Sequence, residues 1–284
     1  MKLGITMEGG ASRTMFSSGV ADALLEAGIL PDYFIGVSAG IGQGISYLSG
    51  QYRRNLDVAV EYMADKRYMG IKYLLDKKKR SLYNVDFVFG EVPDRLVPFD
   101  FEAFRAFQGQ VVAVVTNVHT GKAEYMDVPR DTSCYPLLMA SCALPLAFQP
   151  VKWKKHYYLD GGIADSIPFE QAMREGCDKN IVILTRERGY QKKQGATTRL
   201  AARLYKNYPK MAEALLTRAE RYNACMARLE QLEAEKKVFV VAPESTFGMK
   251  RTEKRAEPLR RLYEAGYQQM KKQLPELMDY LGQV

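Results

Sequence analysis

The residue best placed for covalent chemistry in this 284-residue chain is a serine between two glycines. Ser38 lies at the centre of residues 36–40, GVSAG, which have the form G-x-S-x-G. A serine hydroxyl becomes a nucleophile when it is exposed at a sharp turn, beside a base and in front of backbone N–H groups, and small neighbours give that turn room. Residues 34–37 suit a buried strand, and residues 41–48 suit a helix. The pattern therefore predicts that Ser38 is a nucleophile at a strand-to-helix turn.

A loop of small residues precedes this serine in the chain and suits the binding of an anion. Residues 2–7 are strand-like, and residues 8–14, EGGASRT, lead from that strand into another expected helix. The N–H groups of such a loop are unobstructed, and a helix N-terminus adds partial positive charge. The loop lacks the lysine and the full spacing of nucleotide-phosphate motifs. It fits an oxyanion hole better, because that needs only about two N–H groups that face a serine.

The base that would activate Ser38 is less obvious, because the chain contains only two histidines. His119 lies in a turn-like segment and His156 begins the second arm of an expected hairpin, and each is read as an ordinary half-exposed histidine. Asp160 is the better candidate, since it ends a strand and two glycines leave its carboxylate unobstructed. An aspartate with a pKa near ~4 must act through a direct, partly desolvated hydrogen bond. Taken alone, Asp160 is better explained as a turn residue, because Asp-Gly is a common turn dipeptide.

In their order and spacing, these three motifs resemble those of the patatin-like phospholipase family, and the resemblance covers at least residues 3–185. It assigns Ser38 and Asp160 to a catalytic Ser–Asp dyad. The other positions that it assigns are Gly9, Gly10, Ala11 and Arg13 in the oxyanion loop, Gly36 and Gly40 around the serine, and Gly161 and Gly162 after the aspartate. Residues 140–145, ASCALP, and 148–151, FQPV, are similar to the family's segment that leads into the aspartate.

The resemblance implies an α/β protein with a three-layer α/β/α patatin-like fold, a mainly parallel central sheet and a C-terminal helical extension. It implies a bacterial intracellular serine acyl hydrolase that cleaves fatty-acyl esters through an acyl-enzyme. No metal or cofactor is expected. Apolar residues around Ser38 and on the C-terminal helices are expected to receive acyl chains. Two alternatives remain, namely a small-ester hydrolase or serine peptidase with the same serine turn, and a non-catalytic scaffold that binds membranes or partners.

The oxyanion loop departs from the family pattern at two positions. The usual G-G-G-x-R-G appears here as GGASRT, so Ala11 and Thr14 replace glycines. Ala11 still has an N–H to donate, although a positive φ would cost about 1 kcal/mol at alanine. Thr14 loses little if its hydroxyl or backbone caps the following helix. We expect the oxyanion hole to survive both changes.

Alternation of strand-like and helix-like segments in the first half predicts an α/β layered fold. The expected strands are residues 2–7, 34–37, 111–117, 151–153, 156–159, 180–185 and 238–242. The expected helices are residues 14–26, 41–48, 53–80 and 257–281, with an amphipathic hairpin or bent helix over 197–236. Because the texture changes after residue 185, we assign residues 1–185 to a catalytic core and residues 186–284 to a basic, mostly helical extension packed on it.

The net charge of +8 is concentrated in that extension. Residues 1–185 hold 20 basic and 21 acidic side chains, whereas residues 186–284 hold 21 and 12, a balance of +9. A basic face of this kind attracts anionic membrane surfaces. A nucleic-acid partner is not expected, because no nucleic-acid motif is present. The alternative is a solvated helical surface that keeps the protein soluble.

The cysteine pattern and the apolar stretches indicate a cytoplasmic protein, peripheral at most at the inner membrane surface. The four cysteines form no close pair and indicate reduced thiols. The apolar run after Lys2 is too short for a secretory signal. Residues 33–52 and 132–151 are uncharged and nearly long enough to span a bilayer, but their glycines and prolines favour a buried core.

Overall fold

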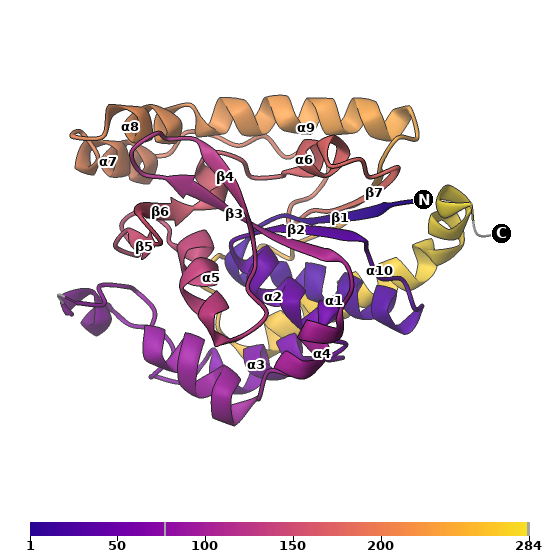
Figure 1. Ribbon diagram of the computed structural model, residues 1–284, viewed down its shortest axis with the longest axis horizontal. Helices are drawn as coiled ribbons and strands as arrows, with labels where there is room; N and C mark the ends of the chain where they lie inside the picture. Colours follow the sequence, from indigo (N-terminus) through magenta and orange to yellow (C-terminus); the bar gives the residue numbers. More distant parts are fainter. Residues whose placement is uncertain (77, 283–284) are drawn as a thin grey trace.

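The computed structural model describes residues 1–76 and 78–282 and shows one sheet of eight strands at its centre (Figure 1). The strand order is β5-β6-β3-β2-β1-β7-β8, and β4 pairs with β3. The strands are β1 (Leu3–Met7), β2 (Tyr33–Val37), β3 (Gln110–Asn117), β4 (Ala123–Asp127), β5 (Val151–Trp153), β6 (His156–Asp160), β7 (Lys179–Ile183) and β8 (Phe239–Val241). The pairs among β3, β2, β1, β7 and β8 are all parallel, whereas β4, β5 and β6 pair antiparallel.

The register of these strands brings three chain segments together at one edge of the sheet. Met7, which ends β1, pairs with Gly36 in β2. Val37, which ends β2, pairs with Val114 in β3, and the next β3 residue pairs with Asp160 at the end of β6. The carboxyl ends of parallel strands share one edge of a sheet, where open α/β folds build their sites. The loop after β1, the turn after β2 and the end of β6 are therefore neighbours.

Helices cover both faces of the sheet (Figure 1). On one face lie α1 (Thr14–Glu26), α2 (Ala39–Leu48), α3 (Arg54–Tyr62), α4 (Phe101–Ala106), α5 (Tyr135–Cys142) and α10 (Ala256–Leu281), and on the other α6 (Phe169–Arg174), α7 (Ala196–Leu204), α8 (Pro209–Leu216) and α9 (Arg218–Ala234). Strand β7 has apolar side chains on both faces, and each face packs against a layer of helices. Its Ile181 and Ile183 join the core cluster of α1 and α10, while Val182 joins that of α9.

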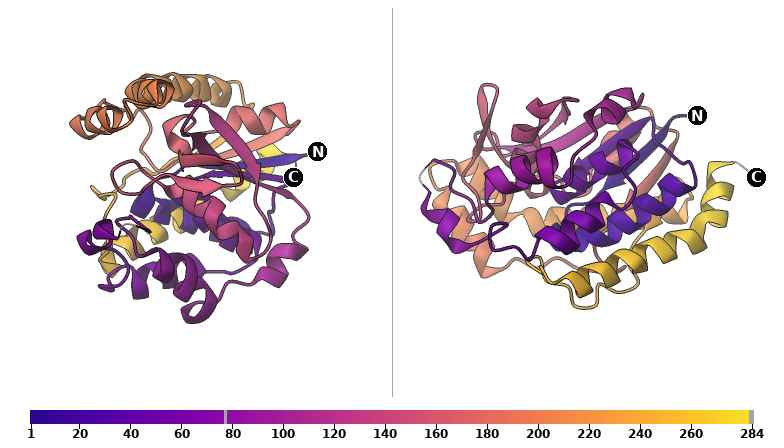
Figure 2. Two further views of the ribbon diagram at one scale, coloured as in Figure 1. Left: turned by 60° about the vertical axis from the view of Figure 1, so that its left-hand side comes forward. Right: turned by 90° about the horizontal axis from the view of Figure 1, so that it is seen from below.

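This arrangement confirms the predicted three-layer α/β/α fold with a mainly parallel sheet and helical C-terminal part. Within residues 186–284, β8 extends the sheet beside β7, and α10 runs along α1 (Figure 2). Tyr263 of α10 donates its hydroxyl to Asp22 of α1 at 2.7 Å. The boundary placed at residue 185 stays a prediction. Across the described chain, none of the helices combines the length and apolar character needed to cross a bilayer.

The long helix predicted over residues 53–80 is wrong. Helix α3 ends at Tyr62, and the chain then turns before a short 3₁₀ helix at Ile71–Leu75. Asp65 explains the break, because its carboxylate accepts the backbone N–H of Arg67 at 2.7 Å and so competes with helical hydrogen bonding. Lys77, also in the predicted helix, lies outside the described residues.

The amphipathic region 197–236 consists of three helices, α7, α8 and α9. Pro209 is the first residue of α8, a position that needs no N–H donor. The sequence did not predict β4, the short helices α4 and α6, α5 within the apolar stretch 132–151, or a π-helical segment at Phe87–Leu96. The π-helical segment contains Pro93, which cannot donate an intrahelical hydrogen bond.

Candidate active site

Ser38 occupies a strained turn between β2 and α2. Its backbone has φ 55° and ψ −129°, a conformation that a residue with a side chain rarely adopts. The flanking glycines are required by close backbone approaches. A Cβ atom at Gly36 would lie 2.7 Å from the backbone nitrogen of Ile41, and one at Gly40 would lie 2.5 Å from the carbonyl oxygen of Met7. The G-x-S-x-G pattern therefore permits a turn that presents the Ser38 hydroxyl to the edge of the sheet.

Ser141 of α5 holds this turn against the sheet. The backbone N–H of Ser38 donates to the Ser141 hydroxyl at 2.8 Å, and that hydroxyl donates to the carbonyl of Val114 at 2.8 Å. Ser141 is fully buried. The segment 140–145 resembles the family, but its motif indicated no role for Ser141. The available signal was a polar side chain in the uncharged stretch 132–151.

Asp160 lies at the end of β6, buried, with 2% of its surface exposed. Its Oδ1 atom accepts the backbone N–H of Gly162 at 2.8 Å. The backbone of Gly161 runs so close to β3 that a Cβ atom there would lie 2.2 Å from the carbonyl oxygen of Val114. Gly161 thus lets the chain pass close against β3, and the backbone of Gly162 holds the carboxylate.

The surroundings of Asp160 act on its ionisation in opposite directions. Burial raises the pKa of this carboxyl, whereas the charge of Arg218 and a hydrogen-bonding interaction with the side chain of Ser38 favour the ionised form and lower it. Arg218 begins α9, and its Nε donates to the carbonyl of Gly162 at 2.6 Å. Ser38 and Asp160 are thus brought together, with a half-buried cation from residues 186–284 beside them.

The loop after β1 faces the same edge. A Cβ atom at Gly9 would lie 2.7 Å from the Cβ of Ser38, so this glycine allows the loop to touch the serine. Ala11 has φ 50°, the left-handed conformation that was expected to cost about 1 kcal/mol at alanine. The Thr14 hydroxyl donates to the Ala11 carbonyl and closes the loop. Within the described part of the chain, the N–H groups of Gly10 and Ala11 donate to no other group.

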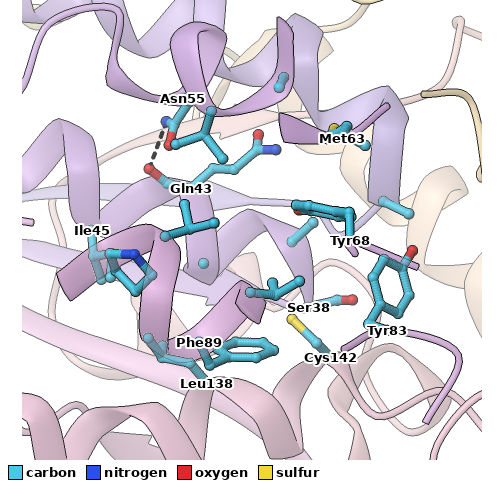
Figure 3. A pocket seen from close by; sticks show the side chains of 18 of the residues that line it. Ser38, Gln43, Ile45, Asn55, Met63, Tyr68, Tyr83, Phe89, Leu138 and Cys142 are labelled. Carbon is cyan, nitrogen blue, oxygen red and sulfur yellow. Dashed lines mark hydrogen bonds between the residues drawn. The ribbon is translucent and has the colours of Figure 1, made fainter. Parts of the chain in front are cut away.

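An apolar cavity of about 210 Å³ opens beside Ser38 (Figure 3). Its lining comes from residues 11–148 only, and includes Ile45, Met63, Tyr68, Tyr83, Phe89, Leu138 and Cys142. Burial raises the pKa of Cys142 to about 12, so its thiol stays neutral next to the serine. The expectation that the C-terminal helices line the acyl site is wrong for this cavity. The apolar side of α9 instead packs on β7 and β8 through Tyr222, Met226, Leu229 and Leu232.

A second, smaller cavity of about 40 Å³ also reaches Ser38 and is polar. Glu8, Gly9, Gly10 and Asp160 line it, together with five cationic side chains, namely Arg13, Arg186, Lys192, Arg218 and Arg251. Four of these cations come from the C-terminal part, where the sequence showed only an excess of positive charge. The two histidines lie elsewhere, since both are exposed and neither lines either cavity.

The fold and the position of the serine turn define a class, the three-layer α/β proteins with a serine in a strand-to-helix turn at the carboxyl edge of the sheet. The family model described as "Patatin-like phospholipase" matches residues 5–173, more than half of the chain. The chain therefore belongs to the patatin-like phospholipase family, a family of lipid acyl hydrolases, as the motifs predicted. A second model, a "Domain of unknown function (DUF6363)", matches residues 208–282.

Two individual proteins illustrate the likeness. The chain is 25% identical over 189 residues to "Uncharacterized protein YjjU" of Escherichia coli strain K12, a match that covers 65% of this chain and 52% of that protein. It thus spans about half the length of this relative. The crystal structure of VipD from Legionella pneumophila is similar with a TM-score of 0.52 and 15% identity, over 97% of this chain and 67% of VipD. This likeness concerns the fold alone.

Proposed function

We propose that this protein is a serine acyl hydrolase of the lipase or phospholipase A type, with Ser38 and Asp160 as its catalytic dyad. One observation carries the proposal. The strained Ser38 turn, the buried Asp160 carboxylate and the free N–H groups after β1 meet at one edge of the sheet, beside an apolar cavity. Membership of a lipid acyl hydrolase family supports the same conclusion.

The mechanism follows from these positions. Asp160 accepts the hydroxyl proton as the Ser38 oxygen attacks the ester carbonyl, and the N–H groups of Gly10 and Ala11 stabilise the oxyanion that forms. Asp160 then gives its proton to the departing alcohol, which leaves an acyl group on Ser38. Water attacks this acyl-enzyme, again with Asp160 as the base, and Asp160 returns the proton to the Ser38 oxygen as the fatty acid leaves. Burial of Asp160 keeps bulk water from its carboxylate and so strengthens the hydrogen bond on which a weak base depends.

The apolar cavity indicates that the acyl group is a hydrocarbon chain. Its lining of aromatic and aliphatic side chains offers few polar partners for a peptide. This favours fatty-acyl esters over the peptide bonds that a serine peptidase would need.

A substrate panel tests the proposal. Wild type, Ser38→Ala and Asp160→Asn should be assayed against phospholipids, lysophospholipids, short p-nitrophenyl esters and peptides. Wild type should cleave the acyl esters but not the peptides, and each variant should lose at least ~10³-fold in kcat, since either change removes the nucleophile or its base. Ser245→Ala, an exposed serine that lines neither cavity, is the control. Full activity of Ser38→Ala would end this proposal, and inactive wild type would favour a non-catalytic scaffold.

We also propose that residues 186–284 make peripheral contact with anionic membranes. Their balance of +9 supports this, because basic surfaces are attracted to anionic lipid. Binding to phosphatidylglycerol vesicles should weaken as salt rises from 50 to 500 mM, roughly the range over which the Debye length shortens from above to well below ~10 Å. Salt-independent binding would contradict an electrostatic contact.

A further inference from the structure

The small polar cavity beside Ser38 holds an unusual concentration of positive charge. Five cations line it, against the carboxylates of Glu8 and Asp160. It shares only Ala11, Ser38 and Leu144 with the apolar cavity, so the two spaces meet at the nucleophile and otherwise have separate walls. The separation suggests that they receive different parts of one substrate.

The cations have no anionic partner of their own. In the part of the chain that the structure describes, none of the five forms a salt bridge. Glu8 is already engaged, because its carboxylate accepts the backbone N–H and hydroxyl of Thr185, at 2.7 and 2.9 Å, and the hydroxyl of Tyr222 at 3.0 Å. Arg13 is 5% exposed, and its buried Nε has no hydrogen-bond partner. A buried cation without a partner is costly, so this arrangement points to a missing anion.

The cations also destabilise one another. Burial, followed by the charges of Arg186 and Arg251, lowers the pKa of Arg13 to about 10. Lys192 lies over the ring of Tyr222, and burial together with the charge of Arg218 lowers its pKa to about 7. A bound anion would relieve both the burial penalty and the repulsion.

We propose that this cavity binds the phosphomonoester headgroup of the substrate, so that the enzyme prefers acyl esters of glycerol phosphate to choline-bearing or uncharged lipids. The inference rests on the proposed hydrolase function and names its substrate class. A phosphomonoester carries close to two negative charges at pH 7 and accepts several charge-assisted hydrogen bonds, which suits clustered guanidinium and ammonium groups. A choline headgroup would instead bring a quaternary ammonium toward five cations.

The size of the cavity fits the same group. A single water needs ~10–15 Å³ of such space, so a cavity of about 40 Å³ accommodates a group of a few heavy atoms. A phosphate is of that size, whereas a bulky headgroup is not. With the phosphate here and the acyl chain in the apolar cavity, the ester carbonyl would lie between them at Ser38.

Two lysolipids with the same acyl chain give the test. The ratio of kcat/KM for 1-palmitoyl-lysophosphatidic acid to that for 1-palmitoyl-lysophosphatidylcholine should be at least ~10 in wild type, and should fall at least ~10-fold in the double variant Lys192→Met/Arg251→Met. A ratio is insensitive to general loss of folded protein. The matched control is Lys250→Met, which is exposed like its neighbour Arg251 but lines neither cavity, and which should keep the wild-type ratio.

A wild-type ratio near one, or a ratio that the double variant leaves unchanged, would overturn the headgroup proposal while the hydrolase function stands. Calorimetric titration of Ser38→Ala with glycerol 3-phosphate and with inorganic phosphate separates the two possible sources of the anion. Glycerol 3-phosphate should bind more tightly, and adding the Lys192→Met/Arg251→Met changes should weaken it at least ~10-fold. Equal binding of inorganic phosphate together with a ratio near one would mean that the cavity serves a free anion. If wild type cleaves no ester, the hydrolase function is contradicted. If Ser38→Ala also fails to bind glycerol 3-phosphate, the anion site is contradicted as well.

Discussion

The two cavities that meet at Ser38 differ in chemistry and in the part of the chain that builds them. The apolar cavity is lined by residues 11–148, whereas four of the five cations at the polar cavity belong to residues 186–284. The serine turn, Asp160 and the loop after β1 lie between them and come from the first 162 residues. The proposed catalytic residues and the proposed acyl site thus lie in the part that matches the patatin-like model, and most of the cations at the polar cavity come from the remainder.

Ala11 lines both cavities, so a change there should affect all substrates alike, whichever cavity they occupy. Proline holds φ near −65° and lacks an N–H, whereas Ala11 has φ 50°. Ala11→Pro should therefore remove an oxyanion donor and distort the loop, and lower kcat by about 10²–10³ for every substrate, whatever its chain length or headgroup. Steady-state kinetics on long and short esters checks this. A loss confined to one substrate class would show that Ala11 belongs to one cavity only.

Gly42 of α2 gives a way to block the apolar cavity alone. It lines that cavity, and a Cβ atom there would meet nothing within 4 Å, so Gly42→Leu should project its side chain into the acyl site. We expect kcat/KM for palmitoyl esters to fall at least ~10-fold relative to butyryl esters. Replacing a helical glycine favours the helix by about 1 kcal/mol, so unfolding does not explain such a loss.

The matched control for Gly42→Leu is Gly90→Leu. Gly90 also has open space at its Cβ position but is absent from the lining of both cavities. It should leave the chain-length preference unchanged. If the two variants behave alike, the apolar cavity is not the acyl site.

Arg218 lines the polar cavity and its charge also acts on Asp160, an effect that the pH dependence of activity can test. Asp160 must be ionised to act as a base, so kcat/KM should rise with pH through its pKa, which burial raises and Arg218 lowers. Arg218→Met removes that cation and should move the acid limb of the profile to higher pH. Other groups that act on Asp160 in the same direction, Ser38, Gly162 and Arg251, remain.

Arg228→Met, on the exposed side of the same helix, should leave the acid limb in place. If the acid limb does not move in Arg218→Met, it reports the ionisation of a group other than Asp160.

The pH dependence of stability is opposite to that of activity. The raised pKa means that the contribution of Asp160 to folding is present below pH ~4 and is lost as pH rises through the folded-state pKa.

The smallest expected effect concerns the loop that both cavities share. Because Ala11 holds a positive φ, Ala11→Gly should raise the free energy of unfolding by up to about 1 kcal/mol. Urea denaturation measures this change. A clear destabilisation would contradict the left-handed conformation at this position.

The sequence predicted the parts of the site that are encoded in short contiguous motifs. Gly36 and Gly40 are needed by backbone contacts next to Ser38 itself, and Gly162 donates to Asp160 two residues away, so local pattern was informative. Ser141 and Arg218 act on these motifs from about 100 and 60 residues away, through contacts that no spacing rule describes.

Residues 186–284 show a second reason why prediction failed. The amphipathic pattern of α9 was visible, but its partner was not. Its apolar side chains pack against β7 and against β8, which pairs with β7 at the end of the sheet. They do not line the apolar cavity. The predicted helix over residues 53–80 failed for a local reason, since one carboxylate, that of Asp65, satisfies a backbone N–H after α3 ends.

The central claim, that Ser38 is a nucleophile activated by Asp160 next to an acyl site, is tested most directly by covalent labelling. A long-chain alkyl fluorophosphonate, followed by peptide mass spectrometry, should modify Ser38 in wild type, label Asp160→Asn at least ~10²-fold more slowly, and leave Ser38→Ala unmodified. Modification of another residue in wild type, or equal labelling rates in wild type and Asp160→Asn, would contradict the account.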